Sequence, residues 1–310
     1  IPVWPQLPSR SFKENMYVQF SEGFPGAVID DNRIYVDNRE DLSKPLEKLY
    51  AAYLENALER YQVGEEYAAG LHAFVRTGAK RALAVKGQVI GPISFGLAVT
   101  DQNRRPLLYD DILADAIAKH LRLKASWQER LLRGISPQTI IFIDEPYLAS
   151  VGSAFVSIPQ AQITSLLEEV LQGIRGLKGI HCCGNTDWSV LLSTSMDVLS
   201  FDAYSYGESL CLYPNEVKGF LDRGGIIAWG IVPNEEKALA GETVTSLLER
   251  LEHLFGAFTS KGIAHHLLAG HCLITPSCGL AGLSPETAVS ALELLAGVSQ
   301  EFRERRIRKP

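Results

Sequence analysis

Residues 179–185 read Gly-Ile-His-Cys-Cys-Gly-Asn, a short apolar strand that gains reactive side chains just before it ends at a glycine. Successive side chains of a strand point to opposite faces, so His181 and Cys183 share one face and Cys182 points to the other. A histidine and a cysteine on one face at a strand end supply half of a zinc site. The other ligands must then come from other strand ends.

Two later predicted strands end in side chains of the same kind. Asp202 follows the strand at 198–201, and Cys278 follows the strand at about 267–275. Each cysteine alone would be interpreted as a small buried residue, but three reactive strand ends together favour a metal site. Zinc would hold a bound thiol as a nucleophilic thiolate near neutral pH. The predicted ligands are His181, Cys183, Asp202 and Cys278.

Around these strand ends the chain repeats one pattern, in which Val/Ile/Leu-rich strands alternate with amphipathic helices. This pattern is typical of parallel strands covered by helices. Strands are predicted near 83–88, 139–143, 179–183, 198–201, 225–230 and 267–275, and helices near 41–62, 65–77, 109–134, 159–175, 187–194, 213–223, 242–261 and 285–305. Because the reactive residues follow the strands, as in the active sites of TIM (β/α)8 barrels, that α/β fold is predicted. An open doubly wound sheet is the alternative.

The N-terminal residues add a further strand and a hairpin. Ile1–Pro8 reads as a short apolar strand, and residues 26–37 read as a hairpin with Asp31 at its tip. Seven strands are one too few to close a barrel, so its first strand and helix are expected upstream of Ile1. Residues 1–310 are then expected to form one catalytic barrel that carries the hairpin as an insertion.

The charge, the cysteine count and the lengths of the apolar runs argue against several classes of function. The formal charge of −6 and the pI near 5.7 argue against nucleic acid or an anionic membrane surface as partners. Five cysteines in a long chain argue against a disulfide framework and for thiols or a metal in a reducing compartment. The sequence shows no apolar run of membrane-spanning length and no signal peptide. A cytoplasmic enzyme is therefore expected.

Two carboxylates follow the strand at 139–143, in Asp144-Glu145-Pro146. A carboxylate there can accept hydrogen bonds from a substrate ammonium group, although a helix cap would explain the same residues. We expect catalytic roles for Asp144 and Glu145, with Asp144 also binding substrate. Trp4 is expected to line the substrate pocket, and a place in the core fits it equally well.

These motifs resemble those of the C-terminal barrel of cobalamin-independent methionine synthases, from about residue 83 onward. That family has a zinc-binding H-x-C, an acidic ligand after a D-V-hydrophobic strand, a P-x-C-G-L cysteine, an I-D-E-P whose aspartate contacts the homocysteine amino group, and a G-P pair. The similar stretches here are His181–Cys183, Asp197–Asp202, Pro276–Leu280, Ile143–Pro146 and Gly91-Pro92. The wider superfamily also holds uroporphyrinogen decarboxylases and corrinoid methyltransferases.

The resemblance implies a zinc-dependent methyltransferase that methylates a thiol, homocysteine, to give methionine. The chain departs from the family at Asp202, where the synthases have Glu, and in residues 230–234, which lack the His of a D-I-H-S motif that assists folate protonation. It also has no room for the family's folate-binding barrel. Because methyltetrahydrofolate needs a protonated leaving amine and a methylcorrinoid does not, the predicted donor is methylcobalamin or another methylcorrinoid, with a corrinoid protein as a possible partner.

Two other functions remain open on the sequence. A uroporphyrinogen decarboxylase-like lyase would have the same fold, but it needs cationic groups for its propionates and no metal. A non-catalytic barrel that binds zinc or a corrinoid is the second, because no acidic homocysteine-binding residue is evident in residues 10–16. Fold alone does not decide between these activities.

Overall fold

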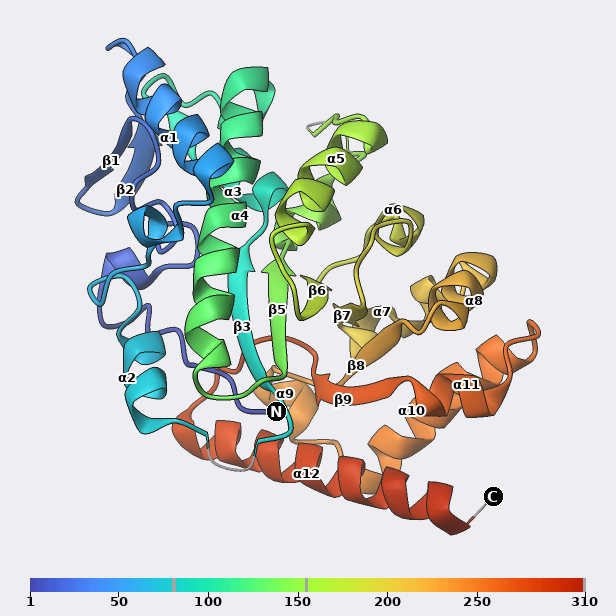
Figure 1. Cartoon of the computed structure of the whole chain (residues 1–310). Coiled ribbons are helices and arrows are strands. Elements are labelled where there is room, and N and C mark those ends of the chain that lie inside the picture. The colour runs from blue at the N-terminus through green and yellow to red at the C-terminus, as the bar shows by residue number, and fades with distance from the viewer. Residues whose placement is uncertain (80–81, 154–155, 309–310) are drawn as a thin grey trace. The chain divides into compact units, whose positions relative to one another are not determined.

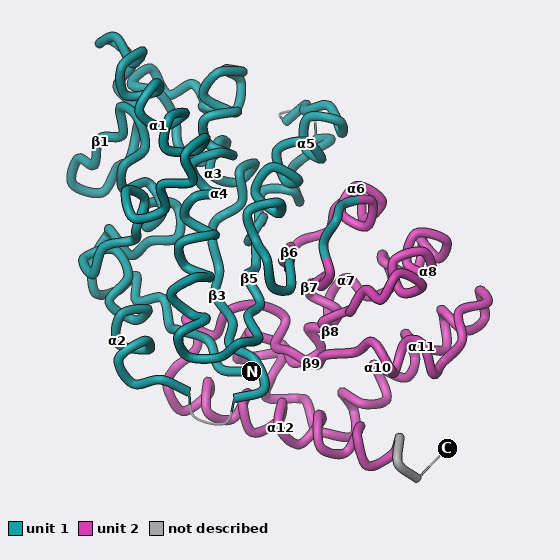
Figure 2. The backbone as a smooth tube through the Cα atoms, in the orientation of Figure 1, with its two compact units in different colours: residues 1–180, 194–196 teal, residues 181–193, 197–310 magenta. Residues whose placement is uncertain are grey.

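The computed structural model describes residues 1–79, 82–153 and 156–308. It contains two compact units, shown in teal and magenta in Figure 2. The first unit comprises residues 1–180 and 194–196, and the second comprises residues 181–193 and 197–310. The boundary falls inside strand β6 (Leu177–Cys182), so this strand contributes to both units.

The first unit is built from short 3-10 turns, helices and two groups of strands (Figure 1). Its elements are η1 (Phe12–Glu14), β1 (Ala27–Asp30), β2 (Arg33–Val36), α1 (Ser43–Glu55), η2 (Leu58–Tyr61), α2 (Ala69–Thr77), β3 (Val85–Ile90), α3 (Pro92–Ala98), β4 (Thr100–Asp101), η3 (Leu107–Tyr109), α4 (Asp111–Arg133), β5 (Thr139–Asp144), η4 (Pro146–Ser150), α5 (Gln160–Leu171) and the start of β6.

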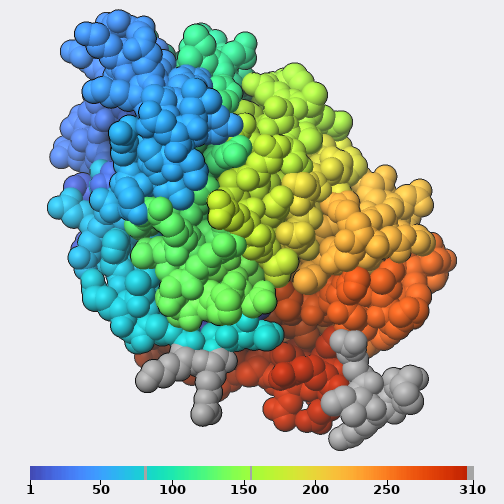
Figure 3. All heavy atoms as spheres, viewed as in Figure 1, coloured from blue at the N-terminus to red at the C-terminus, as the bar shows by residue number. Residues whose placement is uncertain are grey.

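Buried parallel strands form the core of the first unit, in the order β3-β5-β6. Every residue of β3 from Val85 to Ile90 pairs in parallel with a residue of β5, and nearly all side chains of both strands are buried. Helix α4 packs on β3 and on α1. The α1–α4 contact includes a hydrogen bond from the Tyr50 hydroxyl to Asp115 at 2.7 Å, and the blue atoms of α1 lie against green α4 atoms in Figure 3.

The predicted hairpin is present in the first unit. β1 pairs antiparallel with β2, and Asp31 at the tip adopts a left-handed backbone with φ of 47°. β2 also pairs in parallel with β4, which makes a separate three-stranded sheet.

The second unit continues the alternation of strands and helices (Figure 1). Its elements are the end of β6, α6 (Trp188–Leu192), β7 (Val198–Phe201), α7 (Ala203–Leu210), α8 (Pro214–Asp222), β8 (Ile226–Val232), α9 (Glu236–Leu239), α10 (Val244–Thr259), α11 (His265–Gly270), β9 (Cys272–Pro276) and α12 (Pro285–Arg308). The strand order is β6-β7-β8-β9, and β8 pairs in parallel with both β7 and β9.

Aromatic side chains fill the space between β8 and its covering helix. Trp229 of β8 makes edge-on contacts with Phe255 of α10 at 5.3 Å and with Phe201 of β7 at 5.6 Å between ring centroids. All three side chains are fully buried, and each such ring contributes a large apolar area to the core.

The predicted α/β class with parallel strands is confirmed. In the described part of the chain the larger sheet has six strands, and Val3 adds a single parallel bridge to Lys86 of β3 where a longer strand over Ile1–Pro8 was predicted. The strand predicted at 267–275 is wrong at its start, because residues 265–270 form α11 and β9 begins at Cys272. The helix predicted over 41–62 stops at Glu55, since Asn56 takes a left-handed conformation with φ of 53°.

No helix within residues 1–79, 82–153 and 156–308 combines the length and the apolar character that a membrane crossing requires.

Candidate metal centre

The end of β6 presents two neighbouring cysteines in opposite directions. Cys182 is fully buried, and its thiol donates a hydrogen bond to the Gly184 carbonyl oxygen at 3.4 Å. His181 and Cys183, one residue to either side, are half-buried. The predicted alternation is thus present, with Cys182 in the core and its neighbours on the accessible face.

Cys183, His181 and Cys278 come together within the second unit. Their ligating atoms all lie within 4.8 Å of one another, and the Nε2 atom of His181 is 3.7 Å from the sulfur of Cys278. Adjacent sulfur ligands of a tetrahedral zinc ion are about 3.8 Å apart, given Zn–S bonds near 2.3 Å. Two thiols and an imidazole at this spacing therefore fit a zinc ion with small side-chain adjustments.

The two thiols of this group influence each other's protonation. A hydrogen bond from Cys183, together with the neighbouring His181, lowers the pKa of the Cys278 thiol to about 4. The same hydrogen bond and burial raise the pKa of Cys183. Both thiols must be deprotonated to bind a metal ion, so metal binding here would release protons.

His181 is held by a residue that the sequence analysis did not single out. Its Nδ1 atom is 3.0 Å from the hydroxyl oxygen of Ser200 on β7, and Ser200 is 9% exposed. A hydrogen bond at one ring nitrogen fixes the imidazole orientation and leaves the other nitrogen for a metal. A polar residue between Leu199 and Phe201 was the signal in the sequence, because the other residues of β7 are apolar.

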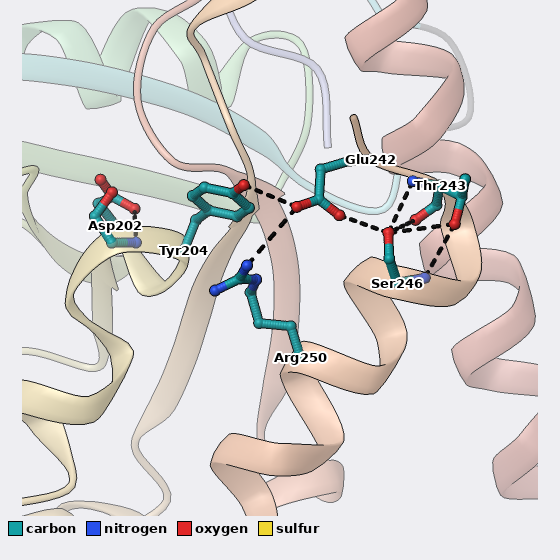
Figure 4. Close-up of polar contacts among 7 residues, drawn as sticks. Asp202, Tyr204, Glu242, Thr243, Ser246 and Arg250 are labelled. Atoms are coloured by element: carbon teal, nitrogen blue, oxygen red, sulfur yellow. Dashed lines mark hydrogen bonds and ion pairs between the residues drawn. The ribbon is translucent and has the colours of Figure 1, made fainter. Parts of the chain in front are cut away.

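Asp202 lies outside the group formed by the other three predicted ligands. It caps α7, where one carboxylate oxygen accepts a hydrogen bond from the Ser205 backbone N–H at 2.8 Å (Figure 4). Burial raises the pKa of Asp202, Ser205 lowers it, and the negative charge at Cys278 raises it. Asp202 therefore lies within electrostatic reach of the thiols, and its place as a metal ligand stays a prediction.

A polar cluster anchors the first turn of α7 beside Asp202. The Tyr204 hydroxyl donates to Glu242 at 2.8 Å, and Arg250 forms an ion pair with the same carboxylate (Figure 4). The Arg250 guanidinium also lies 4.3 Å from the centroid of the Tyr204 ring. Ser246, near the start of α10, also donates to Glu242. These contacts tie the segment that carries Asp202 to α10.

The two predicted carboxylates lie in the first unit, at the end of β5. Asp144 is half-buried, whereas Glu145 is fully buried and caps helix α3. Its carboxylate accepts hydrogen bonds from the backbone N–H groups of Ile93 and Ser94, at 2.9 and 2.8 Å, and from the Ser94 hydroxyl at 2.6 Å. Glu145 therefore satisfies the N-terminus of α3, and its part in catalysis stays a prediction.

This cap explains the nearby Gly91-Pro92 pair. A Cβ atom on Gly91 would lie 2.1 Å from the Glu145 carboxyl carbon, so the position needs a glycine. Burial raises the pKa of Glu145 to about 7, against the hydrogen bonds from Ser94 and Ile93 that lower it. The Gly91-Pro92 pair and the Glu145 carboxylate thus belong to one helix-capping arrangement.

Trp4 is a buried residue of the first unit. Its side chain is 1% exposed, and its indole N–H donates to Gln128 of α4 at 3.0 Å. The Gln128 amide also bonds both backbone groups of Gln88 on β3, each at 2.9 Å. This placement gives Trp4 a packing role, and its contact with substrate stays a prediction.

The fold is shared with known methyltransferases. One similar structure is a B12-independent methionine synthase from Shewanella sp. W3-18-1 in complex with selenomethionine, with 18% identity, a TM-score of 0.53, and coverage of 76% of this chain and 68% of that one. Another is a methyltransferase from Methanosarcina mazei, with 14% identity, a TM-score of 0.51, and coverage of 92% and 78%. At these identities the likeness shows the fold. No family model and no curated protein matches the sequence.

Proposed function

We propose that His181, Cys183 and Cys278 bind zinc and that the protein transfers a methyl group to a thiol held at this metal. The observation that carries the proposal is the convergence of two sulfurs and one imidazole nitrogen within 4.8 Å. Catalytic zinc sites commonly use three protein ligands and keep a further position for water or substrate. Bound zinc would lower the pKa of the incoming thiol and hold it as the nucleophile.

The protein's own residues would prepare the site for that thiol. Ser200 orients the His181 ring, and the thiols of Cys183 and Cys278 would release their protons on metal binding. If Asp202 joins the metal, it must give up or share its cap on α7. Asp144 is proposed to hold the amino group of the acceptor, as the I-D-E-P resemblance implies.

Homocysteine is the proposed acceptor, which would make methionine the product. A methionine synthase among the similar structures supports this choice, together with the sequence motifs around the three ligands. The free cysteines of the site suit a reducing compartment, and we propose a cytoplasmic enzyme on that ground.

The methyl donor is proposed to be a methylcorrinoid, free or on a partner protein. Residues 230–234 hold no proton-donating histidine, and their Asn234 side chain is bonded to Ser277 and Gly279. A folate donor needs a proton at its leaving amine, and general acids typically contribute ~10²–10⁴-fold to such steps. The B12-independent synthase with a similar fold argues for the opposite donor, so the donor requires a direct test.

The experiment is methionine formation from homocysteine, measured with methylcobalamin and with methyltetrahydrofolate in separate assays. Metal content is determined before and after treatment with a chelator. We expect about one zinc per chain, activity with methylcobalamin, and loss of activity on chelation that added zinc restores. Activity from folate alone would reject the corrinoid donor and leave the zinc-thiol mechanism intact. Full activity without metal would reject the mechanism, and no activity with either donor would favour a lyase or a binding protein.

A further inference from the structure

The loop after β9 is held in place by a side chain from the end of β8. The Ser277 hydroxyl donates to the Asn234 Oδ1 atom at 2.8 Å, and the Asn234 Nδ2 atom donates to the Gly279 carbonyl oxygen at 3.3 Å. The Asn234 amide thus bonds the residues on both sides of Cys278. Ser277 is 1% exposed, so its hydroxyl depends on this partner.

Backbone contacts bring the same loop close to β8. The Ser277 N–H donates to the Val232 carbonyl oxygen at 2.8 Å, at a shift in the β8–β9 register between Gly230 and Val232. A Cβ atom on Gly230 would lie 2.8 Å from the Cα atom of Ser277 and 2.4 Å from the Phe201 carbonyl oxygen. The glycine permits this close approach, and Asn234 then fixes the loop that follows.

From these contacts we infer that Asn234 is a positioning residue for Cys278, setting where its sulfur stands relative to His181 and Cys183. The inference rests on the proposed metal centre and deepens it. The Cys278 sulfur lies 3.7 Å from the His181 Nε2 atom, although the two residues are 97 positions apart in the sequence. Cys278 is half-buried and lies beyond the end of β9, so the strand alone does not fix its side chain.

The chemical consequence concerns metal affinity and geometry. Residues that orient metal ligands typically change metal affinity or activity by about 10–100-fold when they are replaced. Without the amide, the loop at 277–279 gains freedom, and the Cys278 sulfur must be ordered at the moment of binding. Asn234 does not reach the metal in this scheme, because both of its polar atoms are engaged with the loop.

The test compares Asn234→Ala with Asn215→Ala, a control at an exposed asparagine of α8. Zinc affinity is measured by competition with a chromophoric chelator, and Co²⁺ is titrated as a spectroscopic substitute. We expect Asn234→Ala to weaken zinc binding about 10–100-fold and to reduce the intensity of the tetrahedral Co²⁺ bands, with Asn215→Ala unchanged. The thermal midpoint of each metal-free variant reports whether the fold is retained.

Ser277→Ala provides a second route to the same result, because it removes the hydroxyl and leaves Asn234 in place. If the two side chains act together, the double variant should lose less affinity than the sum of the single losses. Zinc affinity and Co²⁺ bands that match the parent in both single variants would overturn the inference alone. Failure of the unsubstituted protein to bind zinc would instead overturn the metal centre and the inference with it.

Discussion

The strand ends of the two units use reactive residues in different ways. In the first unit, Glu145 follows β5 and its carboxylate accepts hydrogen bonds from Ile93 and Ser94 of α3. In the second unit, Cys183 follows β6 and Cys278 follows β9, and the two thiols meet each other and His181. Both sets stand where parallel strands end, the usual place for an active site in such folds.

The difference shows that the position at a strand end is insufficient evidence of function. A carboxylate that faces a helix N-terminus is satisfied by backbone N–H groups, so it stabilises the fold. Two thiols and an imidazole nitrogen, in contrast, are good ligands for one metal ion. The partners of a side chain decide its role, and the following experiments test that distinction.

The largest effect on zinc binding is expected when one of the two adjacent cysteines at the end of β6 is replaced. Cys183→Ser should weaken zinc binding by more than about 100-fold, because it removes a ligand and therefore exceeds the effect of residues that only orient ligands. Cys182→Ser should retain the zinc, since Cys182 faces the core and bonds Gly184. Metal content of the two purified variants is the measurement. Equal zinc in both would show that the two thiols are equivalent and that Cys183 is not a ligand.

A smaller effect is expected at Glu145, and it concerns stability. The pKa of Glu145 rises from 4.5 to about 7 in the folded protein, so the folded state binds its proton more tightly than the unfolded state does. The tighter proton binding adds to the free energy of unfolding below pH 4.5, and this stabilisation is lost as the pH rises to 7. It amounts to on the order of 3 kcal/mol at about 1.4 kcal/mol per pKa unit.

The test is denaturant unfolding of the parent and Glu145→Gln at several pH values between 4.5 and 8. The difference between the two proteins removes the contribution of the other titrating groups. We expect the parent to lose stability relative to the variant as the pH rises. The reverse trend would mean that the hydrogen bonds from Ile93 and Ser94 outweigh burial and keep the carboxylate ionised.

Sequence reasoning predicted the parallel α/β fold, and it placed on one face the two residues, His181 and Cys183, that lie near Cys278, because both inferences depend on short patterns. Strand alternation separates Cys182 from His181 and Cys183 without any tertiary information. The partner of Glu145 was missed, since its cap on α3 joins residues 51 and 52 positions apart. The same limit applies to Asn234 and Cys278, whose relation depends on the β8–β9 register.

The smallest effect on zinc affinity is expected at Ser200, which contacts the proposed ligand His181. Its hydroxyl oxygen lies 3.0 Å from His181 Nδ1, and this contact keeps Nε2 directed toward Cys278. Ser200→Ala should therefore lower zinc affinity about tenfold, the lower end of the range for residues that orient ligands. Ser200→Thr retains a hydroxyl and suits a strand, so it should restore most of the affinity. Competition titrations measure both variants. A loss of equal size in the threonine variant would indicate that packing in β7, and not the hydrogen bond to His181, sets the affinity.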